Sequence, residues 1–180
     1  MNDNKIYWLW LTLKDKLTYI EIKALINKFG DPLSIYNIED QEELNGFSPK
    51  VKKYVMDKSL DRAISVYDKT KALNSRVVTI EDDEYPTMLK HIDTPPHVLY
   101  MYGERMDWEK LLTITVVGTR TYNKYGKNAT QKISYDLAKA GAVVVSGMAR
   151  GLDSVAAVAA LKSGNKTVAV LGGGFDKVYP

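Results

Sequence analysis

The 180-residue sequence contains no cysteine, so disulfides, thiolate metal sites and cysteine nucleophiles are excluded together. It has only two histidines, His91 and His97, which leaves little for a zinc site. No apolar run approaches the roughly 20 residues that a membrane-spanning helix needs. The N-terminus also has neither the basic lead-in nor the small-residue cleavage site of a signal peptide. We therefore expect a cytoplasmic protein with no membrane partner and no metal.

The remaining composition is that of an ordinary globular protein, with 45% hydrophobic and 26% charged residues. The formal net charge of +3 is divided unevenly along the chain. Residues 111–180 contain 9 Lys and Arg but only 3 Asp and Glu, whereas residues 1–110 contain 16 and 19. A polyanionic partner would therefore meet the C-terminal part, although a solvated basic surface explains the charge equally well.

The N-terminal part of the sequence has the pattern of short helices. Apolar residues recur at helical spacing up to Phe29. Ser48 is a good N-cap, because Pro49 follows it at the first helical position, and a longer helix is predicted over residues 59–74. We predict a small helical domain over residues 1–75, whose simplest role is packing or interaction with a partner.

The pattern changes at residue 76, where strands and helices begin to alternate. Strands are predicted at 76–80, 98–102, 113–117, 142–145 and 167–171, and helices at 128–140 and 152–161. From residue 113 onward the strands are apolar throughout, which indicates a parallel sheet covered on both faces. We predict an α/β domain over residues 76–180 with a βαβαβ order and right-handed crossovers. The acidic run at residues 81–84 is interpreted as a solvated loop.

Each strand of the predicted parallel sheet ends in residues suited to anions. In an open parallel sheet, ligands bind outside the carboxyl ends of the strands. Glycine lets backbone N–H groups approach a ligand closely, and the helices that follow point their positive ends to the same place. The candidate phosphate-binding residues are Gly118, Thr119 and Arg120 on the first strand end, Ser146, Gly147, Arg150 and Gly151 on the second, and Gly172, Gly173 and Gly174 on the third.

Further candidates follow the first of these strand ends. Arg120 itself can hold a phosphate bidentately. Tyr122 and Tyr125 suit the stacking of bases beside a phosphate site, and Lys124 and Lys127 suit the steering of an anion. Each residue alone has a simpler explanation as a turn, a cap or a packing residue, but the three strand ends together predict a phosphate site.

The class of phosphate ligand can be narrowed by the motifs that are absent. The sequence has no G-x-x-x-x-G-K-[ST] motif, which disfavours a P-loop nucleotidase. The first turn is G-T-R-T-Y, and Ser146 stands where a dinucleotide-binding fold has an acidic ribose ligand. A nicotinamide or flavin is therefore disfavoured, and we expect no cofactor. Because Ser146 also has no evident base beside it, binding is favoured over catalysis.

Three motifs in this region match a known family. They are V-V-G-T-R-x-x-x-x-Y-G at residues 116–126, S-G-M-A-R-G-L-D at 146–153 and T-V-A-V-L-G-G-G-F-D-x-x-Y-P at 167–180. In these motifs, and in their order and spacing, the sequence resembles the DprA/Smf family of DNA-processing proteins.

The resemblance implies a Rossmann-like domain preceded by a small SAM-like helical domain. It implies sequence-independent binding of single-stranded DNA, protection of incoming DNA, assistance in loading the recombinase RecA during natural transformation, and a homodimer at full length, without enzymatic activity. Gly118 and Arg120 match the positions that hold a DNA phosphate, Ser146 and Gly147 match the neighbouring loop, and Gly172 to Gly174 match the third loop. Family members continue beyond the residue that matches Pro180, so we expect the chain to hold an incomplete Rossmann-like domain.

Two other functions stay open at this point. The first is a small-nucleotide sensor or phosphoribohydrolase on a related sheet, although the P-G-G-x-G-T-x-x-E pattern of such enzymes has no counterpart after Gly172. The second is a protein-interaction module that acts through the helical domain.

Overall fold

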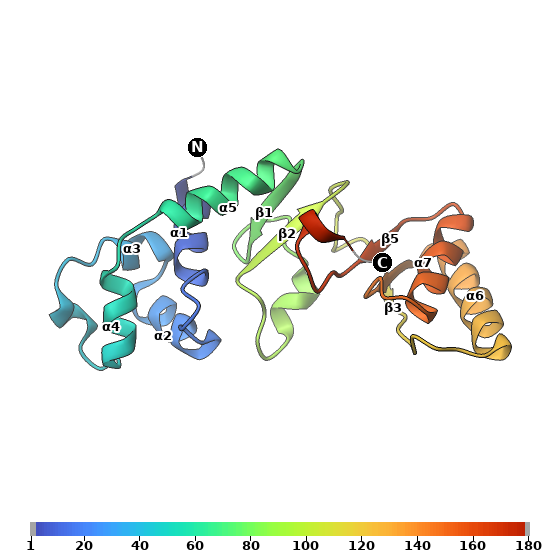
Figure 1. The fold of residues 1–180 in the computed structure, drawn as a ribbon, viewed down its shortest axis with the longest axis horizontal. Coiled ribbons are helices and arrows are strands. Elements are labelled where there is room, and N and C mark those ends of the chain that lie inside the picture. The colour runs from blue at the N-terminus through green and yellow to red at the C-terminus, as the bar shows by residue number, and fades with distance from the viewer. Residues whose placement is uncertain (1–2, 179–180) are drawn as a thin grey trace. The chain divides into compact units, whose positions relative to one another are not determined.

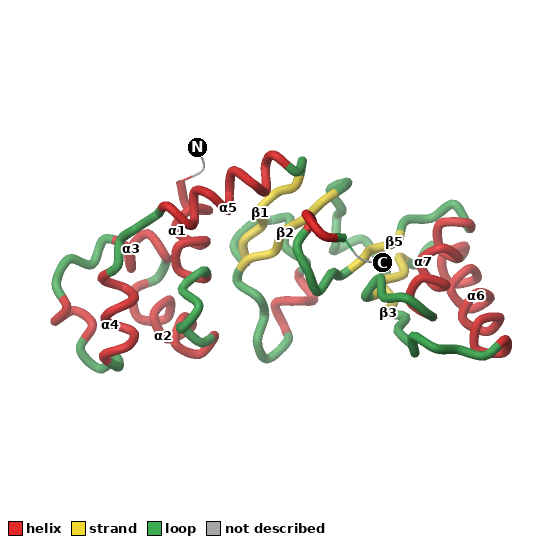
Figure 2. Tube along the Cα trace, viewed as in Figure 1, coloured by secondary structure: helices red, strands yellow, loops and turns green. Residues whose placement is uncertain are grey.

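The computed structural model describes residues 3–178 of the chain. The chain divides into two compact units, residues 1–108 and residues 109–180, and each is described by itself. The first unit consists of helices followed by a β-hairpin, and the second of a parallel sheet with helices (Figures 1 and 2). No helix within residues 3–178 is long and apolar enough to cross a bilayer.

The first unit begins with the predicted short helices. Its elements are α1 (Asp3–Thr12), α2 (Tyr19–Phe29), α3 (Pro32–Tyr36), the 3-10 turn Gln41–Leu44, α4 (Pro49–Met56), α5 (Asp61–Ala72), β1 (Ser75–Thr79), the 3-10 turn Thr87–His91 and β2 (Val98–Tyr102). The predicted cap of α4 is confirmed, because the Ser48 hydroxyl accepts the Val51 N–H at 3.3 Å.

The core of the first unit lies between these helices. Leu9, Leu25, Ile35, Leu44 and Val55 are each 0% exposed. They come from four helices and the 3-10 turn between α3 and α4, so each helix buries an apolar stripe against the others. Removal of this apolar surface from water is the main stabilising contribution to the unit.

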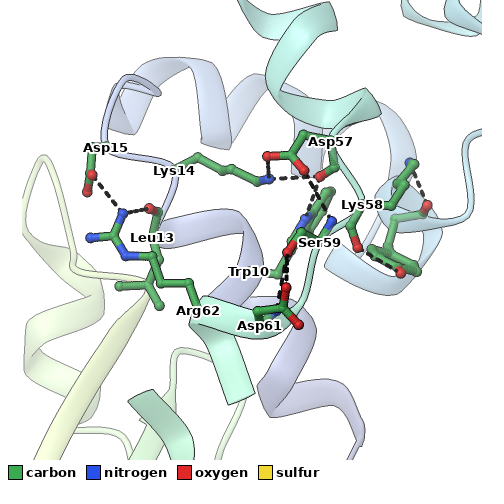
Figure 3. A network of polar contacts seen from close by, with 10 residues as sticks. Trp10, Leu13, Lys14, Asp15, Asp57, Lys58, Ser59, Asp61 and Arg62 are labelled. Atoms are coloured by element: carbon green, nitrogen blue, oxygen red, sulfur yellow. Dashed lines mark hydrogen bonds and ion pairs between the residues drawn. The ribbon is translucent and has the colours of Figure 1, made fainter. Parts of the chain in front are cut away.

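A polar network ties the loop after α1 to the loop before α5 (Figure 3). The Trp10 indole N–H donates to the backbone carbonyl of Asp57 at 2.9 Å, and the Lys14 ammonium pairs with the Asp57 carboxylate at 2.9 Å. The Arg62 guanidinium pairs with Asp15 at 2.6 Å. A hollow of about 270 Å³ lies beside these residues. Because Lys14 and Arg62 are already paired with acids, the network neutralises its own charge.

The acidic run at residues 81–84 is a loop, but its side chains are largely engaged. The Glu81 carboxylate accepts the Trp8 indole N–H at 2.9 Å. The Asp82 carboxylate accepts the Thr79 N–H at 2.6 Å, and Glu84 pairs with Arg76. The prediction of a solvated loop is therefore wrong in one respect, because the acids connect the hairpin to α1 and close the turn after β1.

The β1–β2 hairpin belongs by packing to the first unit. The two strands are antiparallel, with Val77 opposite Tyr100. Val77 is 2% exposed and is part of the helical core. The compact units consequently divide after Trp108, whereas the predicted domains divide between residues 75 and 76. The sequence marks where strands begin, but the division between packed units depends on which core a strand joins.

The second unit has the predicted βαβαβ order and a parallel sheet. Its elements are β3 (Thr113–Thr115), α6 (Lys124–Lys139), β4 (Val143–Ser146), α7 (Leu152–Lys162), β5 (Thr167–Ala169) and the 3-10 turn Phe175–Lys177. The strand order is β3-β4-β5, all parallel, with Thr113 opposite Val143 and Val144 opposite Thr167. The α/β fold class is thereby confirmed. Tyr179 and Pro180, which close the third motif, lie outside the described residues.

Both helices of the second unit lie on one face of its sheet. The helices α6 and α7 pack on each other, and both pack on β4. The chain steps from β3 to β4 to β5 in one direction, so two right-handed crossovers place both helices on the same side. Val116 packs toward the helices, whereas Val117, one residue on, is 69% exposed. Within residues 109–178 the helices thus cover one face, not the predicted two.

Candidate nucleic-acid interface

The carboxyl ends of the three parallel strands bring the predicted loops to one edge of the sheet. Beyond β3, the Val116 N–H donates to the Val145 carbonyl at 2.9 Å, and beyond β5 the Val170 N–H donates to the Ser146 carbonyl at 2.8 Å. These bonds extend the ladders to the ends of the strands. The loops that begin at residues 118, 147 and 172 therefore leave the same edge of one sheet.

The first two loops are packed directly on each other. A Cβ atom on Gly118 would lie 2.7 Å from the Leu152 Cβ, and one on Gly151 would lie 2.6 Å from the Arg120 Cα. Gly151 also has a φ of +106°, which disfavours any side chain. The Leu152 N–H donates to the Thr119 carbonyl at 3.1 Å. The two predicted glycines therefore serve first to let the loops meet.

The Asp153 side chain contacts both of these loops. Its side chain is 5% exposed, and its Oδ1 atom accepts the Gly118 N–H at 3.0 Å. A Cβ atom on Gly147 would lie 2.9 Å from its Oδ2 atom, so the carboxylate also abuts the second loop. Asp153 lies in the first turn of α7, whose N-cap is Gly151.

Ser146 lies beneath the surface of this edge. It is 2% exposed, and its hydroxyl donates to the Val116 carbonyl at 2.8 Å. The contact joins the end of β4 to the end of β3. The hydroxyl is thereby occupied in holding two strands together.

The exposed part of the edge carries cations without acidic partners. Arg120 is exposed in the first loop, and Lys124 and Lys127 are exposed in the first turn of α6. None of these three forms an ion pair with another residue in the described part of the chain. Their charge is therefore available for an anion from outside the protein. Arg150, in the second loop, is exposed as well.

The helix α6 begins at Lys124, earlier than the predicted residue 128. The candidate residues Lys124, Tyr125 and Lys127 therefore lie on the helix. The Asn123 side chain accepts the Gly126 N–H at 2.8 Å and caps the helix at that point. The sequence signal is an Asn followed by helix-compatible residues, but Gly126, three residues further on, is a poor helix former and weakens the prediction. Tyr125 is 81% exposed and Tyr122 is 40% exposed, so both rings can be reached from solvent.

The third loop is the most open of the three. Gly172, Gly173 and Gly174 are all exposed, and a Cβ atom on Gly172 would meet nothing within 4 Å. A Cβ on Gly174 would lie 2.6 Å from the Asp176 Oδ1 atom. This loop can thus receive a bulky ligand at Gly172, while Gly174 is restricted by its neighbour.

Taken together, the edge offers exposed cations, accessible aromatic rings and a glycine loop on a rigid base. A phosphate binds to such cations and backbone groups, and a base can stack on an exposed tyrosine. Asp153 is the important residue that the sequence motifs did not assign to the site. It stands at the end of the second motif, but only its burial and its contact with the Gly118 N–H reveal what it does.

Comparisons with known proteins identify the family of the chain. The sequence profile of the family described as DNA recombination-mediator protein A matches residues 76–180. The chain belongs to this family. It is 30% identical over 192 residues to Protein Smf of Synechocystis sp., an alignment that covers 99% of the chain and 46% of that protein. The chain thus spans about half the length of this curated relative.

Two solved structures of the family resemble the structure of the chain. The X-ray structure of DNA processing protein A from Streptococcus pneumoniae matches with a TM-score of 0.75 and 29% identity, over 100% of this chain and 61% of that one. DNA processing protein A from Helicobacter pylori matches with a TM-score of 0.50 and 34% identity, over 58% of this chain and 46% of that one. The Helicobacter pylori protein binds single-stranded DNA.

Proposed function

We propose that the chain binds single-stranded DNA without regard to sequence at the carboxyl edge of the β3-β4-β5 sheet. The observation that carries the proposal is the group of exposed cations, Arg120, Lys124 and Lys127, that have no acidic partner among the described residues. A backbone phosphate binds to Arg120, and bases stack on the exposed rings of Tyr122 and Tyr125. Phosphate contacts and stacking are common to all nucleotides, which explains why sequence would not matter.

The other predicted residues have supporting parts in this proposal. Gly172 and Gly173 leave room for the strand in the third loop, and Arg150 adds positive charge beside the second. Gly118, Gly147 and Gly151 let the loops pack, and Ser146 holds the strand ends. Thr119 contributes through its backbone, since its carbonyl accepts the Leu152 N–H.

Substitution of Arg120 tests the proposal. The affinity for a labelled oligo-dT, measured by fluorescence anisotropy, should fall with salt at a slope of about −0.7 in log–log form for each phosphate neutralised. Arg120→Ala should weaken binding and make that slope shallower by about 0.7. Lys139→Ala is the matched control, because Lys139 is an exposed cation at the opposite end of α6. Equal losses in both variants, or none, would refute the site.

The same titration separates DNA binding from the small-nucleotide alternative. A strand that spans several contacts must bind far more tightly than its monomer, because each neutralised phosphate adds to the affinity. Excess thymidine monophosphate should therefore not displace oligo-dT from the protein. Complete displacement at micromolar monophosphate would favour a nucleotide sensor or phosphoribohydrolase instead.

We further propose that the bound strand is protected and passed to RecA, as the family assignment suggests, in the cytoplasm and by a homodimer of the full-length protein. The role is binding, with no chemical step assigned to the chain. Loading of RecA during natural transformation is the process that this activity would serve. The helical part suits contact with a protein better than with DNA, because residues 1–110 contain 16 Lys and Arg against 19 Asp and Glu.

A further inference from the structure

The Asp153 carboxylate occupies an unusual place for an acid in an anion-binding region. It is buried at 5% exposure in the first turn of α7, while the exposed groups of the same edge are cationic. Burial of a carboxylate is unfavourable unless hydrogen bonds compensate it. Here the Gly118 N–H donates to Oδ1 at 3.0 Å. The Gly118 N–H is therefore used within the protein and is not available to a ligand.

The two residues that follow Gly118 in the first loop also contact the start of α7. Gly118 is two residues before Arg120, and the intervening Thr119 carbonyl accepts the Leu152 N–H at 3.1 Å. The Arg120 backbone then rests against Gly151, where a Cβ atom would lie 2.6 Å from the Arg120 Cα. Three successive residues of the first loop are thus fixed to the start of α7. Of these three contacts, the one from Asp153 is made by a side chain and can be removed by substitution.

We propose that Asp153 is a positioning residue for the DNA site. Its carboxylate holds the first loop on α7, so that the Arg120 guanidinium is presented at the edge where a phosphate arrives. This inference rests on the proposed function, because it concerns the way in which the site binds single-stranded DNA. Asp153 itself does not contact the strand.

Two substitutions at this position distinguish its hydrogen bond from its charge. Asp153→Ala removes the acceptor, and we expect affinity for oligo-dT to fall about ten-fold, because the contact of the displaced Arg120 with a phosphate, a hydrogen bond between charged groups, is lost. The salt slope should become shallower by about 0.7, since one phosphate contact is lost. Asp153→Asn keeps an oxygen acceptor for the Gly118 N–H and should remain within about three-fold of the parent protein. Equal losses in the Ala and Asn variants, both folded, would overturn the proposal.

A double substitution shows whether Asp153 acts through Arg120. If it does, Arg120→Ala and Asp153→Ala together should weaken binding no more than Arg120→Ala alone. A merely structural role would give additive losses and leave the salt slope unchanged. Asp136→Ala is the matched control, because Asp136 is an exposed acid on α6 that pairs with Lys132. It should bind oligo-dT as tightly as the parent or slightly more tightly.

Gly147→Ala tests the same contact from the other side, in case Asp153→Ala does not fold. The new methyl group would lie 2.9 Å from the Asp153 Oδ2 atom and must displace the carboxylate. We expect weaker binding that is again not additive with Arg120→Ala. If the parent protein does not bind oligo-dT, the proposed function fails. If Arg120→Ala weakens binding but neither Gly147→Ala nor Asp153→Ala does, only the positioning role fails.

Discussion

The absence of a side chain at Gly151 determines how closely two loops of the second unit approach. The Thr119 carbonyl and the Arg120 Cα lie where a Cβ on Gly151 would stand, the latter at 2.6 Å. The backbone there has a φ of +106°, which is strained for any residue with a side chain. Gly172 differs in both respects, since it has an ordinary φ and nothing within 4 Å of its would-be Cβ. Substitution of Gly172 is therefore a suitable control for substitution of Gly151.

Gly151→Ala should destabilise the second unit, whereas Gly172→Ala should not. The strain and the clash with backbone together cost about 2 kcal/mol or more, and displacement of Arg120 should also weaken DNA binding. Gly172→Ala should change the free energy of unfolding by less than about 0.5 kcal/mol. Hydrogen exchange of the amides in β4 and α7 measures the stability of the second unit in both variants. Equal protection in the two variants would show that the loops do not pack as described.

At this scale the sequence predicts residue types better than their roles. The motifs predict that the glycines of the strand ends approach a phosphate. The structure shows a packing requirement as well, because a Cβ atom on Gly118 would meet Leu152 and one on Gly151 would meet Arg120. Which loop packs on which is a property of the folded sheet. A motif gives the order of glycines along the chain, but it does not predict which loops will be in contact.

Among the elements, α2 has a complete capping box at its start. The Thr18 hydroxyl accepts the Glu21 N–H at 3.3 Å, and the Glu21 carboxylate accepts the Thr18 N–H at 2.8 Å. Lys50 of α4 pairs with the same carboxylate at 2.7 Å. The hydrogen bonds from Lys50 and from the Thr18 backbone hold the pKa of Glu21 below its ordinary value of 4.5. Glu21 thus links two helices through its negative charge.

The contribution of this charge should disappear in acid. Because the pKa of Glu21 is lower in the folded state, its stabilisation is fully present above about pH 4.5 and is lost as the pH falls through the lowered value. Glu21→Gln keeps the capping oxygen and removes the charge. The variant should be less stable than the parent at pH 7, and the difference should shrink as the pH falls below 4.5. Tryptophan fluorescence in urea measures this in the first unit, which contains Trp8, Trp10 and Trp108. A difference that persists unchanged in acid would contradict the assignment.

Most elements could be predicted from sequence because their signals are local. The strand at Val98–Tyr102 and the helix at Leu152–Lys162 agree closely with expectation, since a short apolar and aromatic run and a segment rich in alanine and leucine are local signals that need no tertiary context. The start of α6 at Lys124 was missed, because the cap at Asn123 is followed by residues of weak pattern. One-sided coverage of the sheet was missed for another reason. It follows from strand order, which apolar strands alone do not encode.

At the scale of the whole molecule, charge and packing divide the chain in nearly the same place. The basic segment of residues 111–180 corresponds to the second compact unit, which begins at residue 109. The family profile begins earlier, at residue 76, and so includes the hairpin that packs in the first unit. The start of the family match at residue 76 therefore does not coincide with the boundary between the two packed units after residue 108. The excess of positive charge belongs to the unit that carries the proposed DNA site.

Hydrogen–deuterium exchange with and without oligo-dT tests the central claim most directly, because it locates the bound strand without any substitution. We predict that DNA slows exchange at residues 118–127, 147–151 and 172–174, and leaves the helices of the first unit unchanged. The effect should weaken as salt is raised, in step with the loss of affinity. Slower exchange confined to residues 3–108 while the strand is bound would contradict the account.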